Sequence, residues 1–284
     1  PPGFGFLQAL FGTQTNEIAA DYEAWLPKAG LRWTVNRDVS FSFVAQRAYR
    51  AGGAEISVLD GALNTFDPEF LWNYELASRT VWLDGRLRWN ANVYYSDWSE
   101  QQVNEPIPGF PTFFRTVNAG RSTLFGFETD LSFDLTDNVE IYGALGHAFT
   151  EFDDFPNANF DPGLPQGEAN QQNFAGNRFP FAPRWSANLG FAYRDDDGVF
   201  GGIDANYQSD VFDSSENFAV NRCCGRVVVN ARAGYAWNGF SLSAYVRNAF
   251  DEQFFSFVNV RTPGDEIARL GNPRTFAVRL DADF

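Results

Sequence analysis

Residues along most of this chain alternate between apolar and polar over segments of nine to eleven residues. In residues 86–98, one face carries Leu87, Trp89, Ala91, Val93 and Tyr95, and the other face is polar. A period of two predicts β-strands with one apolar face, and the segment length suits a tilted strand that crosses the hydrocarbon of a membrane. We expect eleven strands, at 28–36, 39–48, 69–82, 86–105, 113–134, 138–150, 182–194, 198–208, 225–237, 240–250 and 272–284.

The connections between these segments are short and long in turn. The short ones are polar turns, at Asn36-Arg37-Asp38, Asp84-Gly85, Thr136-Asp137-Asn138, Asp195-Asp196-Asp197-Gly198 and Asn238-Gly239. The long ones cover residues 49–68, 105–112, 151–181, 209–224 and 251–271, and we expect them to be irregular. If consecutive strands are antiparallel, all turns lie at one end and all loops at the other. This asymmetry is typical of an outer-membrane barrel, so the pattern predicts an all-β fold, an antiparallel transmembrane β-barrel.

Composition supports the membrane interpretation. Aromatic residues make up 17% of the chain, and the apolar faces end in rings that suit a lipid–water interface, namely Trp82, Trp89, Trp185, Tyr193 and Trp237. No run of 18 apolar residues exists, which excludes a transmembrane helix. The net charge of −15 argues against a nucleic-acid partner. Acidic residues gather in the long connections. Three interpretations are open: a solvated loop surface, bridging of divalent cations to lipopolysaccharide, or contact with a cationic ligand. The spacing of these residues does not distinguish among them.

The number of strands indicates an incomplete barrel. Single-chain bacterial barrels have an even number of strands, and eleven would leave two unpaired edges in lipid. The chain also contains no Met and opens on Pro1-Pro2-Gly3 without a charged leader or an apolar signal core. We therefore expect a fragment or a processed product whose missing N-terminal region supplies further strands.

Several short motifs occur in an order that resembles the barrel of TonB-dependent outer-membrane receptors. They are Tyr22-Glu23-Ala24-Trp25-Leu26-Pro27-Lys28, Arg50-Ala51-Gly52-Gly53, Asn118-Ala119-Gly120, Asn248-Ala249-Phe250-Asp251-Glu252 and Asn272-Pro273-Arg274-Thr275-Phe276. The resemblance runs from about residue 20 to the C-terminus and departs at Ala51 and Ala249, where Pro and Leu are usual. It implies a 22-stranded barrel around an N-terminal plug. Residues 1–284 would be the C-terminal part of one such barrel domain, with the plug absent from this chain.

The resemblance also implies a function. We expect active uptake of a bulky, scarce nutrient, with a ferric siderophore first among the candidates, across the outer membrane of a Gram-negative bacterium. The implied partners are the TonB complex through the missing N-terminal region, the plug domain, outer-membrane lipid and lipopolysaccharide, the barrel assembly machinery, and a small-molecule metal chelate. A passive porin-type channel and a soluble β-rich binding domain are the alternatives. No cofactor is expected.

No catalytic constellation is visible, so we do not expect an enzyme, and no metal site is predicted. The one histidine, His147, suits a surface or interface position. Glu128 and Asp130 share the polar face of one strand, where a barrel interior accounts for them better than acid–base catalysis does. Cys223 and Cys224 are too few for a zinc site. The two cysteines either form a disulfide with each other or are two free thiols in a loop, and the sequence favours neither alternative.

Aromatic residues beside arginine in the long connections are the candidate ligand site. Such pairs suit flat or chelate-like ligands through stacking and cation–π contact, although packing of the loops against each other explains them equally well. The residues are Phe113, Phe114, Arg115, Phe174, Arg178, Phe254 and Arg261. The terminal aromatic residue, Phe284, resembles the signal that the barrel assembly machinery reads.

Overall fold

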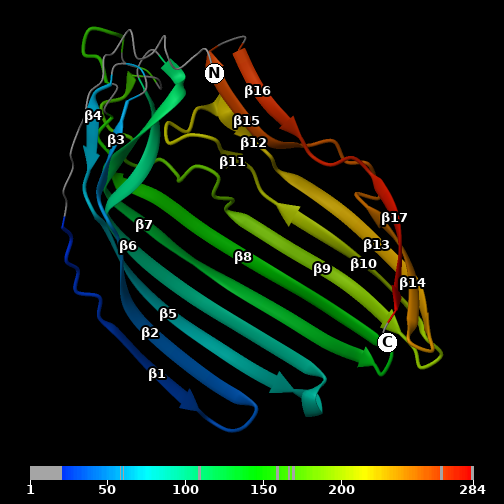
Figure 1. The fold of residues 1–284 in the computed structure, drawn as a ribbon. Helices are drawn as coiled ribbons and strands as arrows, with labels where there is room; N and C mark the ends of the chain where they lie inside the picture. Colours follow the sequence, from blue (N-terminus) through cyan, green and yellow to red (C-terminus); the bar gives the residue numbers. More distant parts are fainter. Residues whose placement is uncertain are drawn as a thin grey trace.

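The computed structural model describes residues 21–57, 59, 61–107, 110–157, 160–165, 167, 170–262 and 265–282. Eleven strands form one antiparallel sheet in which each strand pairs with the next along the chain (Figure 1). They are β1 (Lys28–Thr34), β2 (Val39–Arg50), β5 (Glu69–Trp82), β6 (Leu87–Ile107), β7 (Phe110–Thr136), β8 (Val139–Asp154), β9 (Trp185–Arg194), β10 (Val199–Gln208), β13 (Arg226–Trp237), β14 (Phe240–Arg247) and β17 (Thr275–Ala282). The alternation therefore predicted the number and order of these strands correctly.

The long connections are more regular than expected. Residues 105–112 do not form a loop, because β6 and β7 continue as a hairpin as far as the pair Ile107 and Phe110. Three other connections hold small hairpins, formed by β3 (Gly53–Ile56) with β4 (Leu63–Phe66), β11 (Val211–Phe212) with β12 (Arg222–Cys223), and β15 (Phe255–Thr262) with β16 (Asp265–Leu270). The reason is that backbone N–H and C=O groups of a long packed loop need partners, and local strand pairing supplies them.

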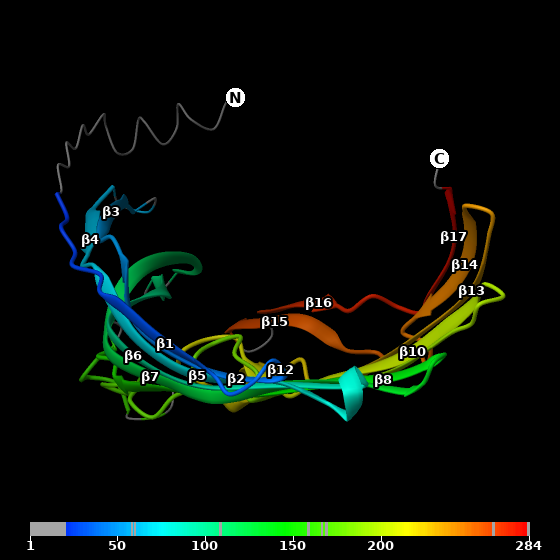
Figure 2. The same ribbon diagram turned by 90° about the horizontal axis from the view of Figure 1, so that it is seen from below.

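The sheet is curved, and its two faces differ in chemistry. Figure 2 shows the curvature, with the β15–β16 hairpin over the concave side. The register aligns apolar residues of neighbouring strands in rows, one of which runs through Leu76, Val93, Phe127, His147 and Trp185. Leu76 and Val93 are about half exposed, at 51% and 52%. An exposed apolar face of this kind is stable against hydrocarbon and costly in water.

Two rows of aromatic rings border this apolar face. Near the long loops, Tyr74, Tyr95, Phe125 and Phe149 lie side by side across β5 to β8. Near the turns, aromatic pairs form at Trp33–Phe41 and Trp237–Phe240, with ring centroids 5.8 and 6.0 Å apart. From Leu87 to Tyr95 the strand rises about 26 Å, or about 20 Å along the normal of a membrane at a tilt of about 40°. The apolar band thus approaches the thickness that an outer-membrane barrel presents to lipid.

Charged side chains begin directly above the loop-side aromatic row. Asp97 follows Tyr95 on the same face of β6, and Arg121 of β7 donates to both of its carboxylate oxygens at 3.0 and 2.9 Å. Thr123 donates to Asp153 at 2.7 Å in the same zone. The change from aromatic to ionic side chains places the membrane boundary here, so β6, β7 and β8 continue beyond it into the loop region. No helix in the described part of the chain is long and apolar enough to cross a membrane.

A hydrophobic cluster holds the longest loop against these strand extensions. It consists of Val103, Ala119, Phe152, Phe155 and Phe174, all buried, with Val117 and Phe179 packed against it. The ring centroid of Phe152 lies 4.8 Å from that of Phe155 and 4.9 Å from that of Phe179. The connection between β8 and β9 is therefore a packed structure that can hold side chains in place at the outer surface.

We expect Phe152→Ala to loosen this loop without opening the sheet. Phe152 is 1% exposed, and removing such a ring typically costs about 3–5 kcal/mol because a cavity remains. Hydrogen exchange of residues 170–179 should become faster, while that of the turn-side halves of β6 to β8 should not change. Leu164→Ala, in the same loop but 56% exposed, is the control. Equal exchange in the two variants would show that the cluster does not hold the loop.

Candidate functional site

The concave face of the sheet is polar and hollow. A depression of about 610 Å³ lies over the central strands and is bordered by alternate residues that include Glu75, Arg79, Glu128 and Asn188. Hydrogen bonds link these side chains across strands, as from Asn90 to Asp130 (2.9 Å) and from Asn188 to Asn206 (2.9 Å). Most of this face is thus a hydrogen-bonded polar wall, which is how the interior of a large membrane barrel is lined.

A second hollow lies at the loop ends of β9, β10 and β13. It has a volume of about 840 Å³, and four guanidinium groups line it, those of Arg178, Arg184, Arg222 and Arg226. We call it the arginine pocket. Its floor is made by the first residues of β9 and β13 and the last residues of β10, so three neighbouring strands position it. Arg178 and Arg222 come from two different long connections that fold over these strand ends.

Positive charge in the arginine pocket exceeds negative charge. The only carboxylates among its described lining residues are Asp210 and Glu252. Asp210 forms an ion pair with Arg222, with 2.8 Å between Nη2 and Oδ2. Burial, with repulsion from Arg184 and Arg222, lowers the pKa of Arg178. Among the described residues, the buried Nε of Arg178 has no hydrogen-bond partner. Positive charges held close together in this way attract an anion. The anion relieves the repulsion between the guanidinium groups and accepts hydrogen bonds from their remaining N–H groups.

The backbone and aromatic rings hold these arginines in place. Asn217 accepts from the Arg178 N–H at 2.7 Å and donates to the Arg178 carbonyl at 2.9 Å, and Arg178 itself donates to the Ala182 carbonyl at 2.9 Å. The Arg178 guanidinium lies 5.5 Å from the ring centroid of Phe212, and that of Arg226 lies 5.0 Å from the ring of Phe254. Stacked guanidinium groups keep their edges free for a planar anionic group.

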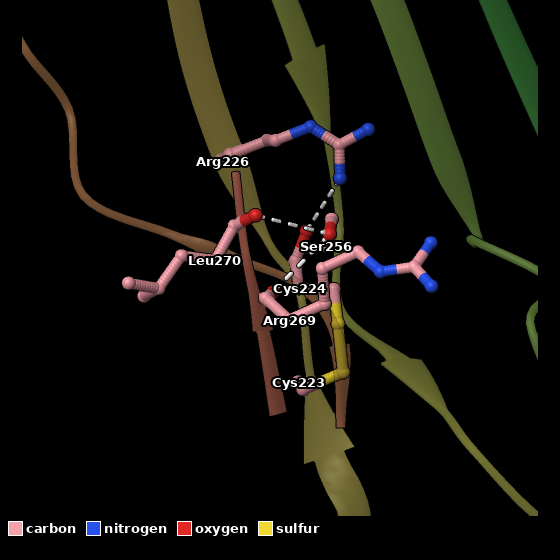
Figure 3. Close-up of a disulfide and its surroundings, with 6 residues drawn as sticks. All are labelled: Cys223, Cys224, Arg226, Ser256, Arg269 and Leu270. Carbon is pink, nitrogen blue, oxygen red and sulfur yellow. Dashed lines mark hydrogen bonds between the residues drawn. A yellow bond between two sulfur atoms is a disulfide. The ribbon is translucent and has the colours of Figure 1, made fainter. Parts of the chain in front are cut away.

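A disulfide between adjacent residues borders the pocket. Cys223 and Cys224 are bonded to each other, between the pocket residues Arg222 and Arg226 (Figure 3). Arg226 donates from Nη1 to the Cys224 carbonyl at 3.1 Å. The β15–β16 hairpin lies alongside, where Ser256 donates to the Arg269 carbonyl at 3.2 Å. Of the two alternatives left open by the sequence, the structure has the bonded form.

A buried carboxyl lies in the neighbouring loop region. Glu105, at the end of β6 beyond the aromatic row, is 4% exposed and pairs in register with Arg115 of β7. Burial, with repulsion from Glu216, raises the pKa of Glu105 to about 8, although Ser215 and Arg115 act in the opposite direction. The β6–β7 hairpin therefore meets the 213–217 segment through a carboxyl that is protonated at neutral pH. That same segment holds Arg178 through Asn217.

The structure brings only some of the predicted ligand residues together. Arg178 lines the arginine pocket, and Phe254 contacts it through Arg226. Phe113 and Phe114 are exposed on the β6–β7 hairpin, and Arg115 lies opposite Glu105, so these three do not line the pocket. Phe174 is 2% exposed inside the loop cluster, where packing accounts for it. The Arg261 side chain and Phe284 lie outside the described part of the structure, so the proposed roles of both stay predictions.

Three residues of the arginine pocket were not predicted from the sequence. Arg222 and Arg226 have no aromatic-rich run around them, whereas Arg184 stands directly before Trp185 and closely follows Phe179 and Phe181. The run Arg222-Cys223-Cys224-Gly225-Arg226 contains a usable signal, because two arginines flank a pair of cysteines that can form a small ring. The aromatic run from Phe179 to Trp185 is a local signal for Arg184, but the folding of β9 beside β10 and β13 is what brings that arginine to the pocket.

An antiparallel sheet with an exposed apolar face, aromatic borders and a polar concave side defines part of a transmembrane β-barrel. Comparison with known families agrees: the family described as TonB dependent receptor-like, beta-barrel, matches residues 7–249. The chain belongs to this family of transport receptors.

Similar proteins include known receptors for metal chelates. The chain is 24% identical over 283 residues to the ferric-pyoverdine M114 receptor PbuA of Pseudomonas sp. (strain M114), which covers 96% of this chain and 31% of that protein. It is 24% identical over 264 residues to the metal-pseudopaline receptor CntO of Pseudomonas aeruginosa, covering 91% of this chain and 33% of that protein. The chain thus spans about a third of the length of these curated relatives.

Solved structures show the same fold. The ferric yersiniabactin uptake receptor FyuA from Yersinia pestis superimposes with a TM-score of 0.73 at 18% identity, covering 91% of this chain and 37% of that chain. The ferric citrate transporter FecA superimposes with a TM-score of 0.68 at 20% identity, covering 91% of this chain and 38% of that chain. The eleven-stranded sheet therefore has the fold of part of these receptor structures.

Proposed function

We propose that this chain is the C-terminal part of the barrel of an outer-membrane receptor that takes up an anionic metal chelate, with a ferric siderophore as the first candidate. The observation that carries the proposal is the arginine pocket, where four guanidinium groups face two carboxylates at the loop end of the barrel wall. Siderophore and metallophore receptors among the relatives support the same ligand class. Charge-assisted hydrogen bonds from arginine suit carboxylate, catecholate or hydroxamate oxygens that surround a bound metal.

The proposed transport cycle needs parts beyond these residues. We propose that a plug domain closes the barrel against the polar concave face, and that a segment before the plug engages the TonB complex, which supplies the energy. Outer-membrane lipid and lipopolysaccharide surround the apolar band and its aromatic rows, and the barrel assembly machinery inserts the chain. The ligand binds first at the arginine pocket and passes inward along the polar wall when the plug rearranges.

Uptake of radioactive iron tests this function. Cells that express the full-length protein as their only receptor for a given chelate should accumulate iron from at least one member of a panel of ferric siderophores. Accumulation should cease when TonB is deleted or a protonophore is added, because transport against a gradient needs energy. The same cells without the receptor are the control. Accumulation that persists without TonB would identify a passive porin instead, and no accumulation from any chelate would contradict the proposed substrate class.

A further inference from the structure

We propose that the Cys223–Cys224 disulfide is the positioning element of the arginine pocket, holding Arg222 and Arg226 in the arrangement that binds an anion. The inference rests on the proposed function, because it assigns a role to residues that border the proposed ligand site. It goes beyond the proposed function because it makes ligand affinity depend on the Cys223–Cys224 disulfide, which does not itself contact the ligand. The bond acts on the ligand through the backbone between the two arginines.

The first argument is the position of the disulfide in the fold. Cys223 is the last residue of β12, which pairs with β11, and Arg226 is the first residue of β13, which belongs to the large sheet. Only Cys224 and Gly225 connect the two strands. The chain must turn sharply there, because the small hairpin and the large sheet are separate pairing units. The disulfide closes a small ring through both side chains and the peptide bond between them, which fixes the direction of this turn.

The second argument is the backbone conformation that the ring holds. Cys224 has φ of +76°, in the left-handed region that residues other than glycine rarely adopt. At Gly225 a Cβ atom would displace the Asp210 carboxylate, which is the ion-pair partner of Arg222. An unbridged residue at position 224 would favour negative φ, and the chain would leave β12 in another direction. The bond thus keeps a conformation that the backbone alone disfavours.

The third argument is that this conformation positions the guanidinium groups of Arg222 and Arg226 in the arginine pocket. The Cys224 carbonyl accepts from Arg226 at 3.1 Å, so the position of Cys224 sets the position of the Arg226 guanidinium (Figure 3). On the other side, Arg222 reaches Asp210 at 2.8 Å. Cys224 is buried, at 9% exposed, whereas the side chains of the Arg222–Asp210 ion pair are 58% and 42% exposed. Both arginines are therefore placed before a ligand arrives, and a ligand gains affinity when the groups that bind it need no further ordering.

Citrate, a small tricarboxylate, is the probe for the test. Its affinity for the purified full-length protein is measured by titration calorimetry for the wild type, Cys223→Ser/Cys224→Ser, Arg226→Gln and the combined triple variant. We expect citrate to bind about tenfold more weakly when the disulfide is lost, from the cost of ordering the arginines. Arg226→Gln should weaken binding by about tenfold. In the triple variant the combined loss should be smaller than the product of the two effects, because part of the effect of the disulfide acts through Arg226.

Reduction of the folded wild type gives a second route that does not depend on folding of the variants. Dithiothreitol breaks the Sγ–Sγ bond by exchange: it is oxidised to its cyclic disulfide, and its two thiol protons pass to Cys223 and Cys224. Citrate affinity should fall as in the serine variant and return on reoxidation. The same treatment of Cys223→Ser/Cys224→Ser is the control, because that variant lacks this bond and any change in it would come from reduction elsewhere in the full-length protein.

The outcomes separate the two proposals. Unchanged citrate affinity after reduction and in the serine variant would overturn the positioning role and leave the proposed function standing. Effects of the disulfide and of Arg226 that multiply in the triple variant would show a general structural role and would also overturn it. Failure of the wild type to bind citrate would overturn the positioning role, and the uptake of radioactive iron would still decide the proposed function.

Discussion

Replacing Arg178 and Arg226 together by glutamine is expected to weaken binding of the transported chelate by at least roughly 100-fold, since each charged hydrogen bond contributes about 1.5–3 kcal/mol. Glutamine keeps a polar side chain, although a shorter one, and removes the positive charge. Arg178 comes from the β8–β9 connection and Arg226 from the start of β13, and both line the same pocket, so their loss removes half of its guanidinium groups. Binding is measured on whole cells with the ferric chelate that the uptake assay identifies, at equal surface abundance of the receptor.

The matched control removes two arginines from the opposite end of the barrel. Arg37 and Arg194 are exposed and lie at turns, so Arg37→Gln/Arg194→Gln changes the net charge equally without touching the arginine pocket. This variant should bind the chelate like the wild type. If the turn variant loses binding while the pocket variant keeps it, the result would show that the barrel has the opposite orientation and that the arginine pocket is not the binding site.

Raising the pH from 7 to 9 is expected to loosen the contact between the β6–β7 hairpin and residues 213–217. In the folded state the pKa of Glu105 is raised from 4.5 to about 8, so the folded protein holds this proton over a pH range in which the unfolded chain has lost it. The contribution to stability is fully present below pH 4.5 and is lost as the pH rises through about 8. The loss accrues at about 1.4 kcal/mol for each pH unit, so most of it has occurred by pH 7, and the step from pH 7 to 9 removes roughly 1–1.5 kcal/mol more.

Hydrogen exchange of residues 213–217, corrected for the intrinsic effect of pH, measures this change. Glu105→Gln stays neutral at every pH and should abolish the extra opening above pH 7. Asp196→Asn, at an exposed turn, is the control and should behave like the wild type. Because Asn217 in this segment holds Arg178, chelate affinity should fall over the same pH range. An exchange profile of Glu105→Gln that matches the wild type would show that Glu105 does not control the contact.

The strand framework follows from the sequence because its causes are local. Alternation with a period of two defines a strand and its apolar face, and turns such as Asp84-Gly85 and Asn238-Gly239 separate strands that pair as neighbours. Each of the eleven strands pairs with the next one along the chain, so no long-range information was needed for their order. The end of an alternating segment was harder to predict. The β6–β7 hairpin extends through residues expected to be a loop, because pairing beyond the membrane depends on the neighbouring strand and not on a lipid face.

The site depended on tertiary structure because its parts are far apart in the sequence. Arg178 and Arg222 belong to two loops that separate strands β8 from β9 and β10 from β13, and only the folding of both loops over the same strand ends brings them together. The same holds for burial: Phe174 and Arg178 lie four residues apart, yet one ring is enclosed in the loop cluster while the other side chain lines the arginine pocket. The sequence alone determined the strands and the aromatic and charged residues available to the loops. Packing between loops decided which of those residues are buried and which are free to meet a ligand.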